Sequence, residues 1–257
     1  MTKEIPVIFK ILKIFGLVSL FLLAAAYFAG STVIVQRQQG QILCKNIHIQ
    51  IVDSTAAQLV LQQDIRAFLD KSGMHLIGKK INEINLYQLE QLISREKGIK
   101  NSEAFVHLNG VLTLRIVQRS PLFRLETSRG SFYLDDSGAL FPTIPQRTAY
   151  VPVVSGNIPV ENESWIAQLY DFGSYIRSHR FWNAQIEQLY VHKPHHIELI
   201  QRAGVHMTVI MGDFDRFEYK LQKLYTFYRT VAVSEGWDRY NYIDLRFNNQ
   251  IVCRKIR

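Results

Sequence analysis

The stretch AFVHLNGVLTLRIVQRSP, residues 104–121, decides the fold of this chain. Asn109-Gly110 separates two runs that are rich in apolar residues, and an Asn-Gly pair favours the tight turn of a β-hairpin. The sequence therefore predicts strands at 104–108 and 111–117. Arg119-Ser120-Pro121 then marks a domain boundary, because the pattern after it changes to short strands and turns.

Upstream of this hairpin, the sequence predicts one strand and two helices. Apolar and polar residues alternate in 42–52, which is typical of a half-buried strand. Ser54 or Thr55 is expected to cap the first helix, and Asn85 the second. The order strand, helix, helix, strand, strand predicts a small α+β domain at residues 42–119, with helices covering one face of a sheet.

Downstream, residues 120–257 predict a second domain that is rich in strands. Asp135-Asp136-Ser137-Gly138 separates two short apolar runs and predicts a hairpin over 132–141. The clearest helix is expected at 215–233, with Lys220 among the basic residues on its exposed face. The remaining expected elements are a helix at 165–179 and strands at 186–192, 197–201, 205–211, 241–247 and 250–256, the last two joined by a turn at Asn248-Asn249.

An uncharged, mostly apolar run at residues 14–35 precedes both domains. As a helix it spans roughly 33 Å, enough to cross a hydrocarbon core of about 30 Å. The basic residues on its N-terminal side are Lys3, Lys10 and Lys13. They predict that residues 1–13 stay in the cytoplasm and that the domains are exported. The alternative is a cleaved signal peptide ending near Ala24-Ala25-Ala26, but the apolar run continues well beyond that point.

The expected fold class is α+β: an N-terminal transmembrane helix, a small β-α-α-β-β domain, and a mixed β-sheet domain with flanking helices. The expected location is the cell inner membrane, crossed once, with the domains outside and periplasmic in a two-membrane host. The net charge of +8 is dispersed, with no basic stripe, which argues against nucleic-acid binding. Cys44 and Cys253 lie at opposite ends of the folded region, so no disulfide is expected.

Residues that often carry chemistry are expected in structural roles here. Asp135 and Asp136 suit a turn, and Asp213 and Asp215 suit the start of a helix, where negative charge is stabilised. The nearest approach to a metal cluster is the group His192, His195 and His196. No nearby Cys or acidic residue is expected to complete a zinc site there. Because no catalytic motif occurs, the sequence predicts no enzyme, no metal, no cofactor and no small-molecule substrate.

The ordered pattern resembles the FtsQ/DivIB family of bacterial cell-division proteins. The segments that carry the resemblance are Gly98-Ile99, Ala104-Phe105-Val106, Asn109-Gly110, 112–116, Gln118-Arg119-Ser120-Pro121, 132–135 with Gly138 and Phe141, Lys220-Leu221 with Leu224, and 242–247. They look like the end of that family's POTRA domain, the opening of its β domain, and its closing helix and strand. The family usually has Glu where Gln118 stands, which is a small departure.

The resemblance implies a scaffold of the division machinery, with a POTRA domain at 42–119 and a β domain at 120–257. It implies that the β domain binds FtsB-like and FtsL-like division proteins and links them to septal peptidoglycan synthesis, while the anchor contacts membrane lipid. The expected route is addition of a partner strand to an exposed sheet edge. The predicted partner-binding residues are Tyr242, Arg246, Phe247, Ile251, Val252 and Cys253.

Within that set, Arg246 is expected to pair with a partner carboxylate and Phe247 to bury its ring. Three alternatives stay open. The terminal strand can be an ordinary core strand, or the chain can be an anchored, exported enzyme. The third alternative is a POTRA-type module of an outer-membrane assembly machine. Such a protein needs the long series of strands of a barrel, and the sequence predicts no such series after the second domain.

Overall fold

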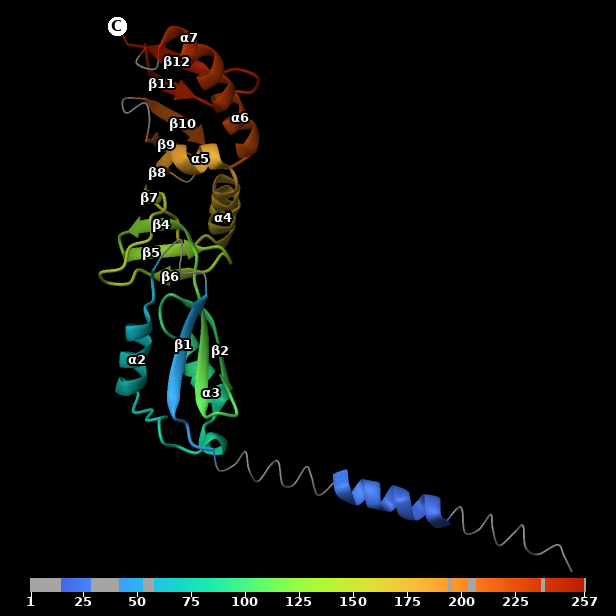
Figure 1. Ribbon diagram of the computed structural model, residues 1–257. Coiled ribbons are helices and arrows are strands. Elements are labelled where there is room, and N and C mark those ends of the chain that lie inside the picture. The colour runs from blue at the N-terminus through green and yellow to red at the C-terminus, as the bar shows by residue number, and fades with distance from the viewer. Residues whose placement is uncertain are drawn as a thin grey trace, which may run out of the picture. The chain divides into compact units, whose positions relative to one another are not determined.

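The computed structural model describes residues 15–28, 42–52, 58–193, 196–202, 207–236 and 239–256. The chain divides into two compact units. The smaller contains Gln62–Ile93 and Ser102–Arg115, and the larger contains Ile116–Arg257. The described residues form one three-stranded and one nine-stranded sheet, and Figure 1 labels most of their strands.

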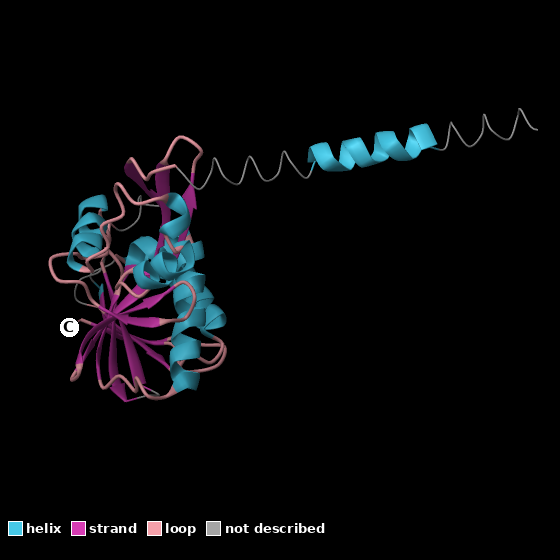
Figure 2. Cartoon of the chain, turned by 90° about the horizontal axis from the view of Figure 1, so that it is seen from below, coloured by secondary structure: helices cyan, strands magenta, loops and turns pink. Residues whose placement is uncertain are grey.

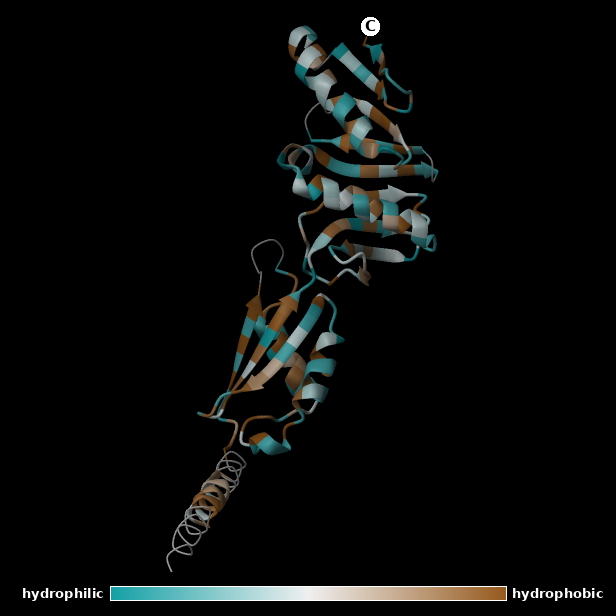
Figure 3. Cartoon of the chain, turned by 90° about the vertical axis from the view of Figure 1, so that its right-hand side faces the viewer, coloured by the Kyte–Doolittle hydropathy of each residue, from teal (hydrophilic) through white to brown (hydrophobic). Residues whose placement is uncertain are grey.

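Residues 15–28 form a helix that is coloured largely as hydrophobic in Figure 3. Its large apolar side chains are exposed. At 1.5 Å per residue this helix is about 21 Å long. None of the helices in the described ranges is long and apolar enough to cross a membrane. Residues 1–14 and 29–35, which hold the rest of the expected span and the three flanking lysines, lie outside the described residues.

The small sheet has the strand order β1-β3-β2. Its elements are β1 (Asn46–Val52), α2 (Gln62–Lys71), a short 3-10 helix (Ile81–Glu83), α3 (Leu86–Ser94), β2 (Ile99–Val106) and β3 (Val111–Gln118). This confirms the predicted order of strand, helix, helix, strand, strand. Gly110 has a φ of 88°, a left-handed conformation that explains why glycine ends the Asn-Gly turn.

Two helix starts in this unit were predicted from capping residues. Asn85 accepts a hydrogen bond from the Gln88 N–H (3.0 Å) and caps α3 as predicted. The prediction for α2 was wrong, because the helix begins only at Gln62. Leu59 and Val60, which precede the helix, are buried. Val60 donates its N–H to the side chain of Gln118 (2.8 Å), and this hydrogen bond fixes the segment before the helix begins. Ser54 and Thr55 lie outside the described residues.

The large sheet has the order β12-β11-β10-β9-β8-β7-β4-β5-β6. Its strands are β4 (Pro121–Thr127), β5 (Gly130–Asp135), β6 (Leu140–Pro142), β7 (Val153–Gly156), β8 (Ile186–Lys193), β9 (His196–Gln201), β10 (Thr208–Gly212), β11 (Tyr240–Asp244) and β12 (Val252–Lys255). The pairs β4–β7, β7–β8 and β10–β11 are parallel and the others antiparallel, so the sheet is mixed as predicted.

The helices of this unit gather along one face of the sheet (Figures 1 and 2). They are α4 (Glu163–Ser178), α5 (Arg180–Gln185), α6 (Phe217–Phe227), a π-helical turn (Tyr228–Ala232) and α7 (Val233–Glu235). Their buried aromatic residues pack against the strands, with Phe172 between Phe214 and Phe217. A Cβ on Gly173 of α4 would lie 2.4 Å from the Phe123 ring, so glycine is needed for this close approach.

Several details of this unit differ from the predictions. Strand β7 and helix α5 were not expected, and the connection between β11 and β12 covers residues 245–251, not two residues. Lys220 is buried, not exposed, because its Nζ bonds to the carbonyl (2.9 Å) and carboxylate (2.5 Å) of Asp213. Of the other predicted positions, His195 and residues 203–206 lie outside the described residues.

Candidate functional site

Strand β12 ends one side of the nine-stranded sheet, so one of its long sides has no neighbouring strand in the described chain. It pairs antiparallel with β11, with Asp244 opposite Val252 and Ile243 opposite Cys253. An edge strand exposes a row of backbone donors and acceptors that another strand can bond. The outward backbone groups of this edge are therefore the ones that a partner strand would bond.

The backbone of β11 shows which side of β12 faces inward. Leu245 donates its N–H to the Ile210 carbonyl in β10 (2.9 Å). Backbone groups of successive strand residues point to opposite sides, so Asp244 points its own N–H toward β12. Val252, its partner, therefore directs its N–H into the ladder with β11.

The other end of β12 agrees with this assignment. Ile256 donates its N–H to the carbonyl of Arg239 (2.9 Å), so this residue also faces inward. By alternation, Cys253 and Lys255 direct their N–H and carbonyl groups away from the sheet. In the described part of the chain, no group bonds to the outward backbone of Cys253.

The side chains of β12 divide between the two faces of the sheet. Ile251, just before the strand, and Cys253 pack against the core under the helices. Val252 is 41% exposed. Beside the strand, a groove of about 560 Å³ runs between α6 with its π turn and the terminal segment. It is lined by Tyr219, Gln222, Lys223, Thr226, Phe227, Thr230, Val231, Tyr240, Asn249, Gln250, Ile251 and Cys253.

Arg246 is not an unoccupied partner for an incoming carboxylate. Its Nε and Nη2 bond to the carboxylate of Asp244, the shortest contact being 2.6 Å. Burial tends to raise the pKa of Asp244, but the hydrogen bonds from Arg246 outweigh it and hold this pKa below its ordinary value. Arg246 therefore stabilises the end of β11, and a partner carboxylate would have to share the Arg246 guanidinium with Asp244.

Two other predicted residues are Phe247, which follows Arg246 in the chain, and Tyr242. Phe247 is 44% exposed in the connection that follows β11. The Tyr242 hydroxyl donates to Asp244 (3.2 Å), and Arg254 of β12 lies over its ring, 5.2 Å from the centroid. Burial and the charge of Asp244 raise the pKa of Tyr242. The six predicted residues thus lie close together around β11 and β12.

The other edge of the large sheet, β6, is shorter and presents fewer outward donors. Thr143 donates its N–H inward to the Ser131 carbonyl (3.1 Å), so the preceding residue, Pro142, faces outward. Proline has no N–H, and β6 has only three residues. Both features blunt an edge strand.

Both edges of the small sheet are covered by side chains from its own helices. Gln62 and Arg66 of α2 donate to the carbonyls of Ile49 (2.9 Å) and Ile47 (3.3 Å) in β1. At the other edge, the Glu90 carboxylate of α3 accepts the N–H of Ala104 in β2 (2.7 Å). In the described residues, helix side chains thus bond backbone groups of β1 and β2, whereas none bonds the outward backbone of Cys253 in β12.

Comparison with known families fits this two-unit architecture. Residues 120–254 match the model described as FtsQ/DivIB, C-terminal related, and residues 42–117 match the POTRA-like domain. The chain belongs to the FtsQ/DivIB family. No curated protein matched it. The matched FtsQ/DivIB domains suggest a cell-division protein, and the family is one of non-enzymatic division scaffolds.

In this FtsQ/DivIB chain, the aspartate pairs hold turns together. Asp135 is fully buried and accepts hydrogen bonds from Ser137 and Ala139 (both N–H at 2.9 Å), while Arg119 Nη1 lies 2.6 Å from its second oxygen. Burial tends to raise the pKa of Asp135, but these bonds lower it overall. Arg119 belongs to the segment that resembled the family's boundary motif, and its contact joins that segment to the β5–β6 turn.

The histidines form a smaller polar group than a metal site needs. His192 Nε2 lies 3.0 Å from Glu198, so an acidic residue is present where none was expected. His196 packs edge-on against His192, at 4.9 Å between ring centres. Among the described residues, no group of three or more potential ligands is positioned to hold a metal ion.

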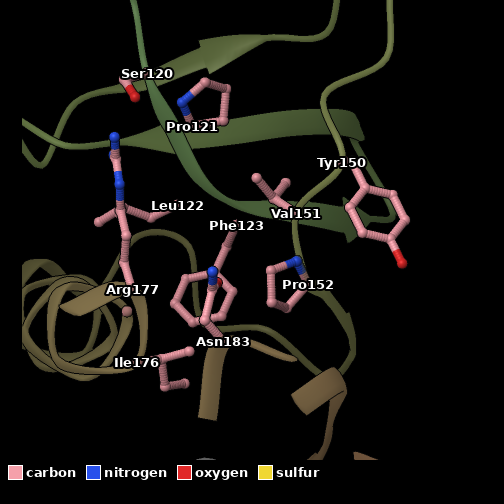
Figure 4. A pocket seen from close by; sticks show the side chains of 11 residues that line it. Ser120, Pro121, Leu122, Phe123, Tyr150, Val151, Pro152, Ile176, Arg177 and Asn183 are labelled. Atoms are coloured by element: carbon pink, nitrogen blue, oxygen red, sulfur yellow. The ribbon is translucent and has the colours of Figure 1, made fainter. Parts of the chain in front are cut away.

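A second cavity of the FtsQ/DivIB domain lies far from β12 in strand order, between β4 and α4 (Figure 4). Ser120, Arg177 and Asn183 supply its polar groups, and Phe123 and Ile176 form part of its apolar wall. Its volume of about 150 Å³ is below the range of roughly 300–1,000 Å³ that is usual for ligand pockets. We therefore place the candidate site at β12.

Sequence reasoning found the strand but missed Lys223, whose Nζ bonds to the segment before β12. It also missed Gln62 and Glu90, which bond to the edges of the small sheet. No motif marks any of these backbone contacts. The available signal was weak: Lys223 follows Arg216 by seven residues, a spacing that places both on one helix face. Cys44 and Cys253 form no disulfide; Cys44 is buried, and Cys253 is half-buried.

Proposed function

We propose that this chain is a membrane-anchored scaffold of the division machinery whose β12 edge pairs with a strand of an FtsB-like partner. In the proposal an FtsL-like protein joins the same assembly, which links the chain to septal peptidoglycan synthesis. The observation that carries it is the outward, unbonded backbone of Cys253 on an edge strand. The family supports the division setting.

The proposal rests on a contrast among the sheet edges. A protein that blunts an edge prevents unwanted pairing, and an edge left open is available for a specific partner. Here β6 ends in proline, and side chains bond to the edges of β1 and β2. Ile251, Val252 and Phe247 add apolar surface beside the open edge, which gives side-chain selectivity to backbone pairing.

We also propose that residues 14–35 anchor the chain in the inner membrane, with residues 1–13 in the cytoplasm. The support is the uncharged apolar run and the three lysines before it. A fluorescent fusion in dividing cells tests location and function together. A mid-cell band is expected, and an even membrane signal would count against the division proposal.

The decisive binding test removes one backbone donor. Cys253→Pro deletes the outward N–H, so binding to the host's FtsB-like protein should be lost. Cys253→Ala keeps that N–H and removes the thiol, so it is the matched control and should bind as the wild type does. Circular dichroism must show that both variants are folded. Equal binding by the proline and alanine variants would show that the partner docks elsewhere.

A second variant tests the side-chain part of the interface. Phe247→Ala removes a half-exposed ring beside the edge, and aromatic anchors of this kind contribute about 2 kcal/mol or more to binding. Surface plasmon resonance measures the change in affinity. Leu108→Ala, at an exposed apolar position in the small unit, is the control that should leave the affinity unchanged.

A further inference from the structure

The connection between β11 and β12 is held by one face of helix α6 and the residue before it. Arg216, just before the helix, donates to the side chain of Asn248 (2.6 Å). One turn later, the Tyr219 hydroxyl donates to the side chain of Asn249 (2.9 Å). Residues three and seven positions apart lie on the same helix face, so Lys223 continues this row.

Lys223 makes the most extensive contact of the row. Its Nζ donates to the backbone carbonyls of Leu245 (2.9 Å), Phe247 (2.6 Å) and Gln250 (3.1 Å). An ammonium group has three N–H donors, so these three carbonyls use all of them. Desolvation and the nearby positive charge of Lys220 lower the pKa of Lys223. The charged form is kept in this position by the carbonyl dipoles of the connection.

These contacts act where strand pairing is absent. Residues 245–251 lie between β11 and β12 and include Phe247, while the strand that follows carries the outward backbone of Cys253. A segment that is ordered before binding loses less conformational entropy when its partner arrives. Lys223 contacts the connection at its beginning, middle and end, so it can fix both the aromatic side chain and the start of β12.

We propose that Lys223 is a positioning residue that holds residues 245–250 in one conformation and so pre-organises the β12 edge for a partner strand. This inference rests on the proposed function. It assigns Lys223 no contact with the partner, and it places the effect of Lys223 in the unbound protein. That separates it from a lysine that forms an ion pair across the interface.

The experiment compares three full-length variants with the wild type in detergent. Lys223→Met keeps an unbranched stem and removes the three donors, and Lys223→Arg restores donors at the same position. Arg229→Met is the control, because Arg229 is an exposed cation further along the same helical segment, stacked on Tyr225. Amide hydrogen exchange of residues 245–256 is measured without a partner, and affinity for the host's FtsB-like protein is measured by surface plasmon resonance.

In Lys223→Met, the amides of 245–256 should exchange faster in the unbound protein while the core strands keep their protection. Affinity should fall about tenfold, since several backbone residues must then be ordered on binding. Lys223→Arg should recover part of both effects, and Arg229→Met should show neither. Unchanged exchange with weaker binding would overturn the inference and assign Lys223 a direct contact with the partner.

Faster exchange with unchanged affinity would also overturn the inference. Lys223 would then order residues 245–250 without affecting the affinity for the partner. Failure of the wild-type protein to bind is a different result, since it removes the proposed function and with it the docking part of the inference. The exchange measurement then still decides whether Lys223 holds the connection. The two failures are therefore distinguishable.

Discussion

The two edges of the large sheet have similar ion pairs but differ in their outward backbone groups. Near each end a buried aspartate binds an arginine at 2.6 Å, Asp135 with Arg119 beside β6 and Asp244 with Arg246 beside β12. The outward backbone differs, because β6 ends in Pro142 and β12 presents the N–H of Cys253. The difference shows that a short strand and one proline leave β6 with fewer outward donors than β12 has.

The comparison also separates stability from recognition. Asp135 is fully buried and closes the turn that forms β6, so this end contributes to the folded state. At the other end, Val252 and Phe247 are each more than two-fifths exposed, so they contribute less to folding and are available to a partner. Changes near β6 should therefore affect folding most, and changes at β12 should affect binding most.

The largest effect on folding is expected from Asp135→Ala. It removes the hydrogen bonds from the N–H and hydroxyl of Ser137 and from the N–H of Ala139, and it leaves Arg119 without its partner. Breaking a buried ion pair of this kind costs about 3 kcal/mol or more. Urea denaturation followed by tryptophan fluorescence measures the change in unfolding free energy. Asp136→Ala, at the next and more exposed carboxylate, is the control, with about 0.5 kcal/mol or less expected. A similar small loss for Asp135→Ala would remove the structural role that we give to this end.

Acidification should weaken both ends of the sheet. The pKa values of Asp135 and Asp244 are lower in the folded protein than their ordinary 3.8. A lowered folded-state pKa adds stability that is present above the unfolded pKa and is lost as pH falls through the folded value. The urea midpoint should therefore drop as pH is lowered from neutral toward about 3. Asp135→Asn and Asp244→Asn should each flatten part of that drop, and an unchanged pH profile in both would refute this cause.

Pro142→Val would add an outward donor to the β6 edge. The new residue supplies an outward N–H on β6, which should allow pairing between copies and increase self-association. Loss of proline's restriction on the unfolded chain should lower stability by only about 0.4–1 kcal/mol. Sedimentation velocity measures the association, with Pro145→Val in the adjoining turn as the control. If Pro142→Val stays as monomeric as the wild type, the short length of β6 is what protects this edge.

The smallest effect on folding is expected from Val252→Thr on the open edge. Val252 is 41% exposed, and threonine also favours strands, so unfolding free energy should change by about 0.5 kcal/mol or less. Thermal denaturation checks this value. Ile243→Thr, at a buried position, is a contrasting variant whose unfolding free energy should fall far more. A loss of about 2 kcal/mol at Val252 would show that the edge strand is part of the core, and the contrast between the two ends would fail.

Much of the secondary structure could be predicted because its signals are local. The Asn109-Gly110 turn, the Asn85 cap and the strand at 197–201 depend on residues close together in the chain, and the structure confirms them. Helix α2 was predicted too early because Val60 is held by Gln118, which lies 58 positions away. The connection after β11 was predicted too short for the same kind of reason, since its contacts come from α6.

The sequence by itself determined the order of elements in the small unit, the family and the identity of the terminal strand, because periodicity and turn residues act over a few neighbours. Tertiary structure alone decided that β12 is an edge, that Cys253 and not Val252 faces outward, and that Arg246 already binds Asp244. Those facts depend on which strand lies beside which. Strand order is set by packing between residues far apart in the chain, which local patterns do not record.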